Sequence, residues 1–560
     1  MNKLIYLSLV AVIYLLIGIF IINVISDHPF TQLLDPYIID FSKYFLSHKS
    51  ESDIYVKLLE AEESFMYIWA SFPLLLLILY LSINSKLIFK QISSVQNYNL
   101  NPYGYNSIIL IAIAAGLSLF IELMIIRLHS SYFQIFAFHK NFSLLSCLLG
   151  LGIGYIFGGR PLINLKYCFP MFSLQILFMF LLRYTPLGSF LQNPISEQQA
   201  MGQGFAQGFL QLSLIYFFII TIFLFNAICF IPLGHLISNL MLTENKLIAY
   251  SYNLIGSIGG IIIFSITCYI WAPPIVWLLI CFTVYLIFIP KNINDLWPPV
   301  LSFLLLIIVL GIPHSLNKFD IYSPYQILTV DLSSKEKVVI KTSNLFFQKI
   351  YDFRDIHDRI SNNLFQKGET SEVGTSIYER YNLPYKFNEK LDNVMIVGSG
   401  TGNDVAAALR NNAKHIDAVE IDPAIYHLGE ILHPESPYQS NKVSVEVKDA
   451  RSFIKDTNRL YDLIVYGLLD SHTMLSGLSG GIRLDSYVYT IEAFREARSK
   501  LNKNGLISLS FSVLSKELGT KIYFMLKKAF DGKEPIVFTN LKKGTNFQED
   551  TYTYIIGDNL

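Results

Sequence analysis

The chain changes character at about Pro313, and this change constrains its fold more than any other feature. Up to that point the sequence is a series of long apolar runs, whereas from Asn317 onward it has the charge density of an ordinary globular protein. An apolar run of about 20 residues can cross a bilayer as a helix, which bonds its backbone groups internally. The sequence therefore predicts an all-α polytopic membrane domain over residues 1–316, followed by water-soluble domains.

The composition agrees with this division. Hydrophobic residues make up 52% of the 560 residues, more than an ordinary soluble protein carries. The formal net charge is zero and no basic block occurs, so no nucleic-acid partner is expected. All five cysteines lie in or beside the apolar runs, so the soluble part has no thiolate metal site, and no metal is expected.

Nine apolar runs are candidate membrane spans, and we expect about 8–10 helices. The runs are residues 4–25, 66–83, 108–126, 142–158, 169–182, 209–231, 254–271, 275–289 and 300–312. With a cytoplasmic start, an odd number of spans would export the soluble part. Lys and Arg are spread too evenly over the loops to decide the orientation, so either one run is miscounted or the first residue lies outside.

Two features of the apolar runs have alternative interpretations. Glu122 and Arg127 lie within and at the end of the third run. Ionisable residues at that depth are functional candidates, but an ion pair that packs helices is the more ordinary explanation. The glycines of residues 150–159 and 256–260 would let helices approach closely, and we expect them to serve packing.

Residues 393–405 indicate a ligand-binding turn. Four apolar residues form a short strand, glycines follow at positions 398, 400 and 402, and an apolar helix begins near Val405. Glycine lets the chain tighten, and amide groups at a helix start can face the polar groups of a ligand. The residues expected to hold the ligand here are Gly398, Ser399, Gly400, Thr401, Gly402 and Asp404.

A second strand, residues 416–422, contains Glu420 and Ile421 at the position where open α/β sheets hold ribose hydroxyls. The ligand is therefore expected to be a nucleoside. A dinucleotide would require Gly-x-Gly-x-x-Gly, but Asn403 stands where its last glycine is expected. The observed Gly-x-Gly-x-Gly spacing resembles the S-adenosylmethionine (SAM) turn of class I methyltransferases and of spermidine synthases.

Other segments extend this resemblance to spermidine synthases. Residues 323–330 and 337–341 read as a hairpin, similar to the small N-terminal β-domain of that family. Gln326 and Gln348 match family positions that line the substrate site. Residues 443–449 predict a third strand, and the resemblance implies that Asp449 and Ala450 contact adenine. Asp449 can equally cap the following helix.

The fourth strand, residues 461–466, departs from the family. Spermidine synthases follow this strand with Asp-x-x-Asp, whose first carboxylate is proposed to deprotonate the attacking amine. Here the first Asp is replaced by Gly467, and the second is Asp470. We expect Asp470 and His472 to act at the acceptor, because His is a common general base and a carboxylate can orient it. Tyr466 and Tyr489 are expected to contact the substrate.

The family also carries Asp where this chain has Thr401, and that acid is expected to disfavour the carboxylate of SAM. Both departures favour methyl or other alkyl transfer from SAM to an unknown acceptor, which is a small molecule or a lipid. The alternatives are aminopropyl transfer from decarboxylated SAM, as in polyamine synthesis, and a membrane carrier regulated by a SAM-sensing domain. The second alternative depends on Glu122 and Arg127.

The fold class expected overall is a helical membrane domain joined to an α/β Rossmann-like domain. The expected bounds are residues 1–316 for the membrane domain, 317–390 for the small β-subdomain and connector, and 391–560 for the SAM-binding domain. The apolar half also resembles, loosely, bacterial multi-spanning proteins with a spermidine-synthase-like domain. This resemblance implies a bacterial inner membrane with the soluble domain in the cytoplasm, and leaves a homo-oligomer open.

Overall fold

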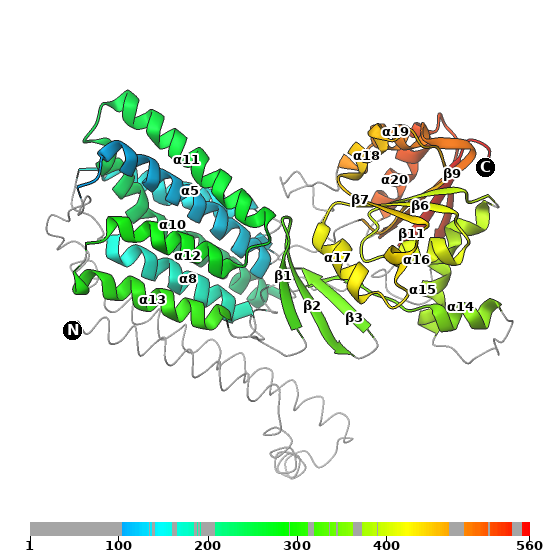
Figure 1. The fold of residues 1–560 in the computed structure, drawn as a ribbon, viewed down its shortest axis with the longest axis horizontal. Coiled ribbons are helices and arrows are strands. Elements are labelled where there is room, and N and C mark those ends of the chain that lie inside the picture. The colour runs from blue at the N-terminus through cyan, green and yellow to red at the C-terminus, as the bar shows by residue number, and fades with distance from the viewer. Residues whose placement is uncertain are drawn as a thin grey trace, which may run out of the picture.

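A computed structural model gives the architecture. It describes residues 104–133, 135–136, 140–159, 165–183, 188, 191, 208–290, 292–311, 318–334, 337–342, 345–361, 372–388, 390–469, 487–512, 516–539 and 551–560. A helical bundle lies at one end of the molecule and an α/β domain at the other, with a small sheet between them (Figure 1). The first two apolar runs, residues 4–25 and 66–83, lie outside the described residues.

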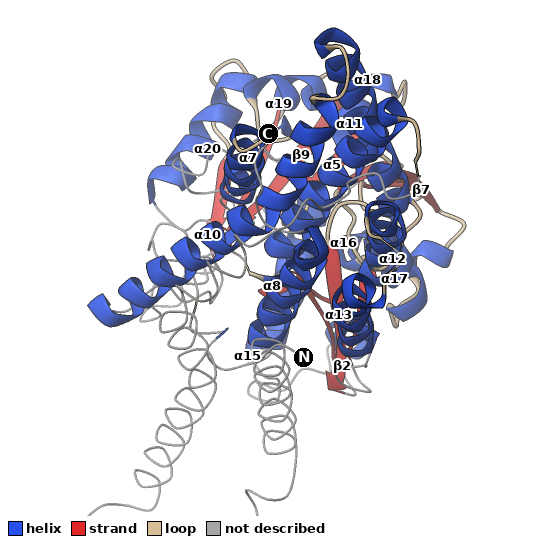
Figure 2. Cartoon of the chain, turned by 90° about the vertical axis from the view of Figure 1, so that its left-hand side faces the viewer, coloured by secondary structure: helices blue, strands red, loops and turns tan. Residues whose placement is uncertain are grey.

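Each of the seven apolar runs within the described part of the chain contains a helix. The helices of the bundle are α5 (Ser107–Tyr132), α7 (Lys140–Ile156), α8 (Cys168–Arg183), α10 (Gly208–Met241), α11 (Lys246–Tyr269), α12 (Pro274–Tyr285) and α13 (Ile293–Gly311), with short 3₁₀ turns η1 (Leu165–Tyr167) and η3 (Leu286–Phe288). Figure 2 looks onto this bundle, with the sheets behind it. Its helical nature is confirmed, and five of its helical segments are long and apolar enough to cross a membrane by length and composition.

Glycines allow two helix pairs to touch backbone to backbone. A Cβ added at Gly256 would lie 2.0 Å from the Ala112 carbonyl oxygen of α5, and one at Gly150 would lie 2.1 Å from the Ala227 oxygen of α10. The prediction that glycines serve close packing is therefore confirmed at these positions. Gly152 and Gly259 have nothing within 4 Å of such a Cβ, so close packing does not require them.

The bundle interior contains a connected set of polar side chains. His129 lies 3.0 Å from Ser143 Oγ through Nδ1 and 3.2 Å from the Gln175 amide nitrogen through Nε2. Gln175 donates to Asn226 Oδ1 at 3.2 Å, and Asn226 donates to Ser146 Oγ at 2.6 Å. Buried polar groups are costly unless they are hydrogen-bonded, and these residues from four helices supply one another with partners.

The small sheet is a four-stranded antiparallel meander. Its strands are β1 (Lys318–Tyr322), β2 (Ile327–Ser334), β3 (Lys337–Thr342) and β4 (Leu345–Lys349), in the order β1-β2-β3-β4. The predicted hairpin is confirmed as β2 and β3. The connector that follows contains α14 (Arg354–Ser361), α15 (Glu372–Asn382) and η4 (Leu383–Phe387).

The α/β domain is built on a seven-stranded sheet of order β10-β11-β9-β8-β5-β6-β7. Its strands are β5 (Asn393–Val397), β6 (His415–Glu420), β7 (Val443–Val447), β8 (Tyr461–Tyr466), β9 (Leu501–Ser512), β10 (Ile536–Thr539) and β11 (Thr551–Gly557). Only β11 runs antiparallel to its neighbours β9 and β10. The predicted Rossmann-like succession, including the final strand pair, is confirmed.

Helices cover both faces of this sheet, because side chains alternate along its buried central strands. Met395 and Val397 of β5 face the core shared with α18 (Ala450–Asp456), α19 (Ile491–Arg498) and α20 (Lys516–Ala529). Val394 and Ile396 face the opposite core, shared with α16 (Asn403–Arg410) and η5 (Pro437–Gln439). The helix α17 (Pro423–Leu432) packs instead on the small sheet through Ile425 and Leu428.

Candidate functional site

The glycine turn follows β5 and begins α16, as the sequence predicts. Gly398, Gly400 and Gly402 have φ values of +69°, +57° and +103°, a region that side chains other than glycine rarely adopt. Gly402 is the N-cap position of α16. Backbone conformation therefore requires glycine at all three positions.

Protein acceptors bind every amide group of this turn. Gly398 and Ser399 both donate to the Val419 oxygen at 2.9 Å, and Gly402 donates to the Ser399 oxygen at 3.0 Å. Gly400 donates to Glu420 Oε2 at 2.8 Å, and Thr401 donates to Gln348 Oε1 at 3.3 Å. These hydrogen bonds set the shape of the turn. The amide groups at the start of α16, which are expected to face a ligand, follow this turn, and their role stays a prediction.

Glu420 lies at the carboxyl end of β6 and supports the turn. Its two carboxylate oxygens accept from Gly400 N at 2.8 Å and from Asp422 N at 3.0 Å. The side chain is buried, and this burial raises the pKa of Glu420 to about 7. The Ile421 backbone also bonds this carboxylate. A carboxylate has about four lone-pair positions, so one remains for a hydroxyl donor such as that of a ribose. The residue therefore fits a nucleoside while holding the turn.

Asp449 follows β7 and caps α18, because its Oδ1 accepts from Ser452 N at 2.8 Å. The predicted N-cap is confirmed, and the second oxygen has no hydrogen-bond donor within the described residues. Ala450 begins α18 and packs against the core, while Ile421 is half-buried after Glu420. Their roles toward adenine and the nucleoside stay predictions.

Several residues that contact the site are missing from the sequence prediction. Asn403 is buried and joins the small sheet to α16, since it donates to the Lys349 oxygen at 2.8 Å and accepts from Tyr351 N at 3.1 Å. The Tyr438 hydroxyl lies 2.6 Å from the Gly400 oxygen and 2.9 Å from Ser399 Oγ. These contacts span distant segments, so spacing along the chain gives no signal for them.

Tyr325 is a further residue at this edge. Burial, together with the carboxylates of Asp422, Asp449 and Glu420, raises the pKa of Tyr325. Its ring is about half exposed, at 49%. An aromatic ring beside the acids that would hold a nucleoside is suited to contact that ligand. Tyr325 is the neighbour of Gln326, the residue that the sequence predicts at this place.

The remaining predicted site residues lie in two environments. Gln348 contacts the turn, and Gln326 accepts from Thr342 Oγ1 at 3.2 Å. Tyr466 is fully buried with its ring against Phe494, and Tyr489 packs edge-on against Phe511. Their substrate roles stay predictions. Asp470 and His472, together with the predicted flexible loop 475–481, lie outside the described residues.

The carboxyl end of β8 is occupied by a different carboxylate. A Cβ built on Gly467 would lie 2.9 Å from Asp404 Oδ2, which belongs to the first turn of α16. Burial raises the pKa of Asp404 to about 6, although Arg380 and Arg410 act in the opposite direction. Gly467, where the resemblance expects an acid, therefore lies next to the half-buried carboxylate of Asp404 in α16.

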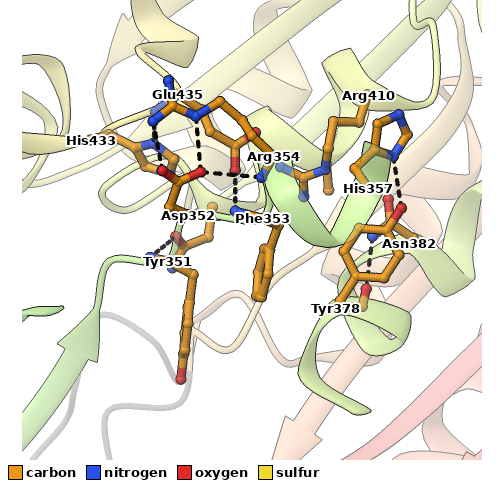
Figure 3. Close-up of polar contacts among 12 residues, drawn as sticks. Tyr351, Asp352, Phe353, Arg354, His357, Tyr378, Asn382, Arg410, His433 and Glu435 are labelled. Carbon is orange, nitrogen blue, oxygen red and sulfur yellow. Dashed lines mark hydrogen bonds and ion pairs between the residues drawn. The ribbon is translucent and has the colours of Figure 1, made fainter. Parts of the chain in front are cut away.

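Polar contacts hold the connector against α16 (Figure 3). Arg410 of α16 forms an ion pair with Glu435, and Glu435 also accepts from Phe353 N at 3.0 Å. His433 Nδ1 accepts from Glu435 N at 3.1 Å, and burial lowers the pKa of His433 to about 4. The histidine is therefore neutral at physiological pH, as its acceptor role requires.

The bundle reaches the site through Arg127. Its guanidinium donates to the oxygens of Ser323 and Pro324, in the loop that carries Tyr325. Ser323 Oγ in turn donates to Asp422 Oδ2 at 2.6 Å, next to Glu420. Within the described part of the chain, no ion pair joins Arg127 to Glu122. The interpretation of Glu122 and Arg127 as an ion pair that packs helices is therefore wrong, because Arg127 connects the bundle to the small sheet.

These features define a Rossmann-like domain with acidic side chains at the carboxyl edge of its sheet. Residues 380–539 match the family described as Spermine/spermidine synthase domain. The chain is 30% identical over 125 residues to a polyamine aminopropyltransferase of Alkaliphilus metalliredigens (strain QYMF), which covers 22% of this chain and 43% of that relative. It is 25% identical over 138 residues to polyamine aminopropyltransferase 2 of Hyperthermus butylicus, covering 24% and 42%.

The chain therefore spans less than half the length of these curated relatives. Among solved structures, a spermidine synthase from Thermotoga maritima is 13% identical, with a TM-score of 0.31, covering 43% of this chain and 72% of that one. The C-terminal part thus carries a spermidine-synthase domain match, with relatives that are named polyamine aminopropyltransferases.

Proposed function

We propose that the α/β domain transfers an aminopropyl group from decarboxylated SAM to an amine acceptor. The observation that carries this proposal is that the family match, residues 380–539, contains the glycine turn, Glu420 and Asp449. Glu420 retains an acceptor position for a ribose hydroxyl, and Asp449 retains one oxygen for adenine. The curated relatives that match this segment are named for aminopropyl transfer, which favours it over the methyl transfer predicted from the sequence.

Methyl transfer from SAM is the second candidate, and Thr401 supports it. This residue stands where the resemblance expects an acid that disfavours the carboxylate of SAM. Thr401 is fully buried, and its Oγ has no hydrogen-bond partner among the described residues. A buried hydroxyl without a partner is costly, so a polar ligand group at this position would be favourable.

Calorimetry on the full chain in detergent would rank the donors. We expect decarboxylated SAM to bind more tightly than SAM, and NAD to bind not at all. Mass spectrometry after incubation with donor and a mixture of diamines would then detect the aminopropyl product. Preference for SAM together with methylated products would reject aminopropyl transfer, and tight binding of NAD would reject both transferase functions.

We further propose that the bundle spans a membrane, the inner membrane of a bacterium, with the α/β domain on the cytoplasmic side where its donor is made. Only 17% of the apolar window of α11 and of α13 is buried within the protein. Exposed apolar side chains on α11 include Ile255, Ile258 and Ile262. Lipid would cover such faces at no cost. If alkaline carbonate extracts the protein from membranes, the proposal is contradicted. Protection of the α/β domain from protease in right-side-out vesicles tests on which side of the membrane it lies.

A further inference from the structure

The end of β8 lacks the carboxylate that an aminopropyl transferase is expected to use, yet the backbone there does not require glycine. Gly467 is absent from the glycines with positive φ, so a side chain is compatible with its conformation. The nearest atoms to a Cβ at this position are Asp404 Oδ2 at 2.9 Å and the Gly398 oxygen at 3.5 Å. The space that a side chain at residue 467 would enter is therefore taken by the carboxylate of Asp404.

This carboxylate is also available for chemistry. Among the described residues, none donates a hydrogen bond to the Asp404 side chain; the neighbouring Tyr385 hydroxyl bonds its backbone oxygen at 3.3 Å instead. The side chain is half-buried rather than fully covered. It lies beside Gly398, the first residue of the donor turn. A carboxylate near the donor, partly desolvated and without a bound donor group, is poised to accept a proton.

We propose that Asp404 is the general base of the transfer reaction, in place of a carboxylate on residue 467. This inference rests on the proposed function. The acceptor enters as an ammonium and gives one proton to the Asp404 carboxylate. The freed amine nitrogen then attacks the carbon bound to the sulfonium sulfur, a C–N bond forms, and the C–S bond breaks with its electron pair going to sulfur. The products are a neutral thioether and a secondary ammonium, and Asp404 releases its proton to water.

The ordinary role for Asp404 is that of an acid in the first turn of a helix, where it stabilises the helix dipole. A matched variant separates the two roles. Glu492 is an exposed acid in the first turn of α19. Glu492→Gln removes the same charge from the same kind of position, and we expect it to leave turnover unchanged. Asp404→Asn removes the charge with almost no change in volume.

The decisive experiment moves the carboxylate to residue 467. Single-turnover rates and donor affinities are measured on the full chain for Asp404→Asn, Asp404→Ala and the double variant Asp404→Ala/Gly467→Asp. General-base catalysis typically contributes about 10²- to 10⁴-fold. We expect Asp404→Asn to lose at least about 100-fold in rate with unchanged donor affinity, and the double variant to recover at least about tenfold over Asp404→Ala.

Two results would overturn the inference. One is an Asp404→Asn protein whose rate stays within threefold of the native chain. The other is a double variant that melts at the same temperature as Asp404→Ala and is no faster. Failure of the proposed function looks different, because the native chain itself would then yield no aminopropyl product.

Discussion

The two sides of the candidate site are built in different ways. The donor side, consisting of residues 398–402, Glu420 and Asp449, is held by backbone hydrogen bonds and by φ values that only glycine adopts easily. The proposed acceptor side, at the end of β8, is occupied by the Asp404 carboxylate of α16. The proposed donor side therefore tolerates few backbone changes, whereas the proposed base lies on a different element of the same fold.

The largest expected effect is on the donor side. Glu420→Ala leaves the amides of Gly400 and Asp422 without their acceptor, at a cost of about 1–3 kcal/mol each. The ribose contact would be lost as well. We expect donor affinity, measured by calorimetry, to fall by at least about 100-fold, which corresponds to about 2.7 kcal/mol. Glu430→Ala in α17 is the control. An affinity within threefold of the native value would show that the donor side does not depend on Glu420.

The acceptor side should respond to pH. The pKa of Asp404 is raised to about 6, and a base must be deprotonated to act, so turnover should fall about tenfold for each pH unit below that value. The charged and titratable groups that face this carboxylate are Arg380, Arg410, Tyr381, Tyr385 and Tyr438.

Burial raises the pKa values of the three tyrosines, so they stay neutral over this range and do not produce the fall in rate. Burial also raises the pKa of Glu420 to about 7, so the donor is kept saturating to keep that titration out of the measured rate. Single-turnover rates between pH 5 and 8 measure this fall in rate at low pH, which is the acid limb of the profile. Asp404→Asn should abolish this limb, and a limb that survives in that variant would assign it to another group.

A glycine substitution tests whether the donor side depends on backbone conformation. Gly398→Ala places a side chain at φ +69°, which costs about 1–2 kcal/mol, and its Cβ would meet Leu469 at 1.6 Å. We expect donor affinity to fall by about tenfold. Gly532→Ala is the control, because φ is +95° there and nothing lies within 4 Å. It should lower the melting temperature similarly but leave affinity unchanged. Equal affinities for both variants would argue against a donor at this turn.

The smallest effect concerns Asp449, whose cap and adenine roles can be separated. Asp449→Ser keeps a helix-capping hydroxyl but withdraws the second oxygen, so the unfolding free energy should change little while donor affinity falls a few-fold. Asp449→Ala should lose both, with about 1 kcal/mol of stability removed. Melting curves and calorimetry give the two readouts. If the Asp449→Ser and Asp449→Ala variants bind the donor as tightly as the native chain does, Asp449 serves only as a helix cap.

Local patterns in the sequence predicted the glycine turn and the elements on either side of it well. The strand β5, the turn and the helix α16 are contiguous, so hydrophobic periodicity and glycine spacing report on them directly. The same holds for the apolar helices of the bundle and for the cap at Asp449. The acceptors that hold the turn amides, from Val419, Glu420 and Gln348, could not be predicted because they reach the turn from other segments.

The sequence by itself determined the division into apolar helices and an α/β domain, the order of strands along the chain and the position of the glycine turn, because these depend on neighbours in the chain. Only the tertiary structure decided that Asp404 lies against Gly467 and that Arg127 of the bundle holds the loop beside Glu420. Such contacts join residues far apart in sequence. Their formation depends on how helices and strands pack, which no local spacing specifies.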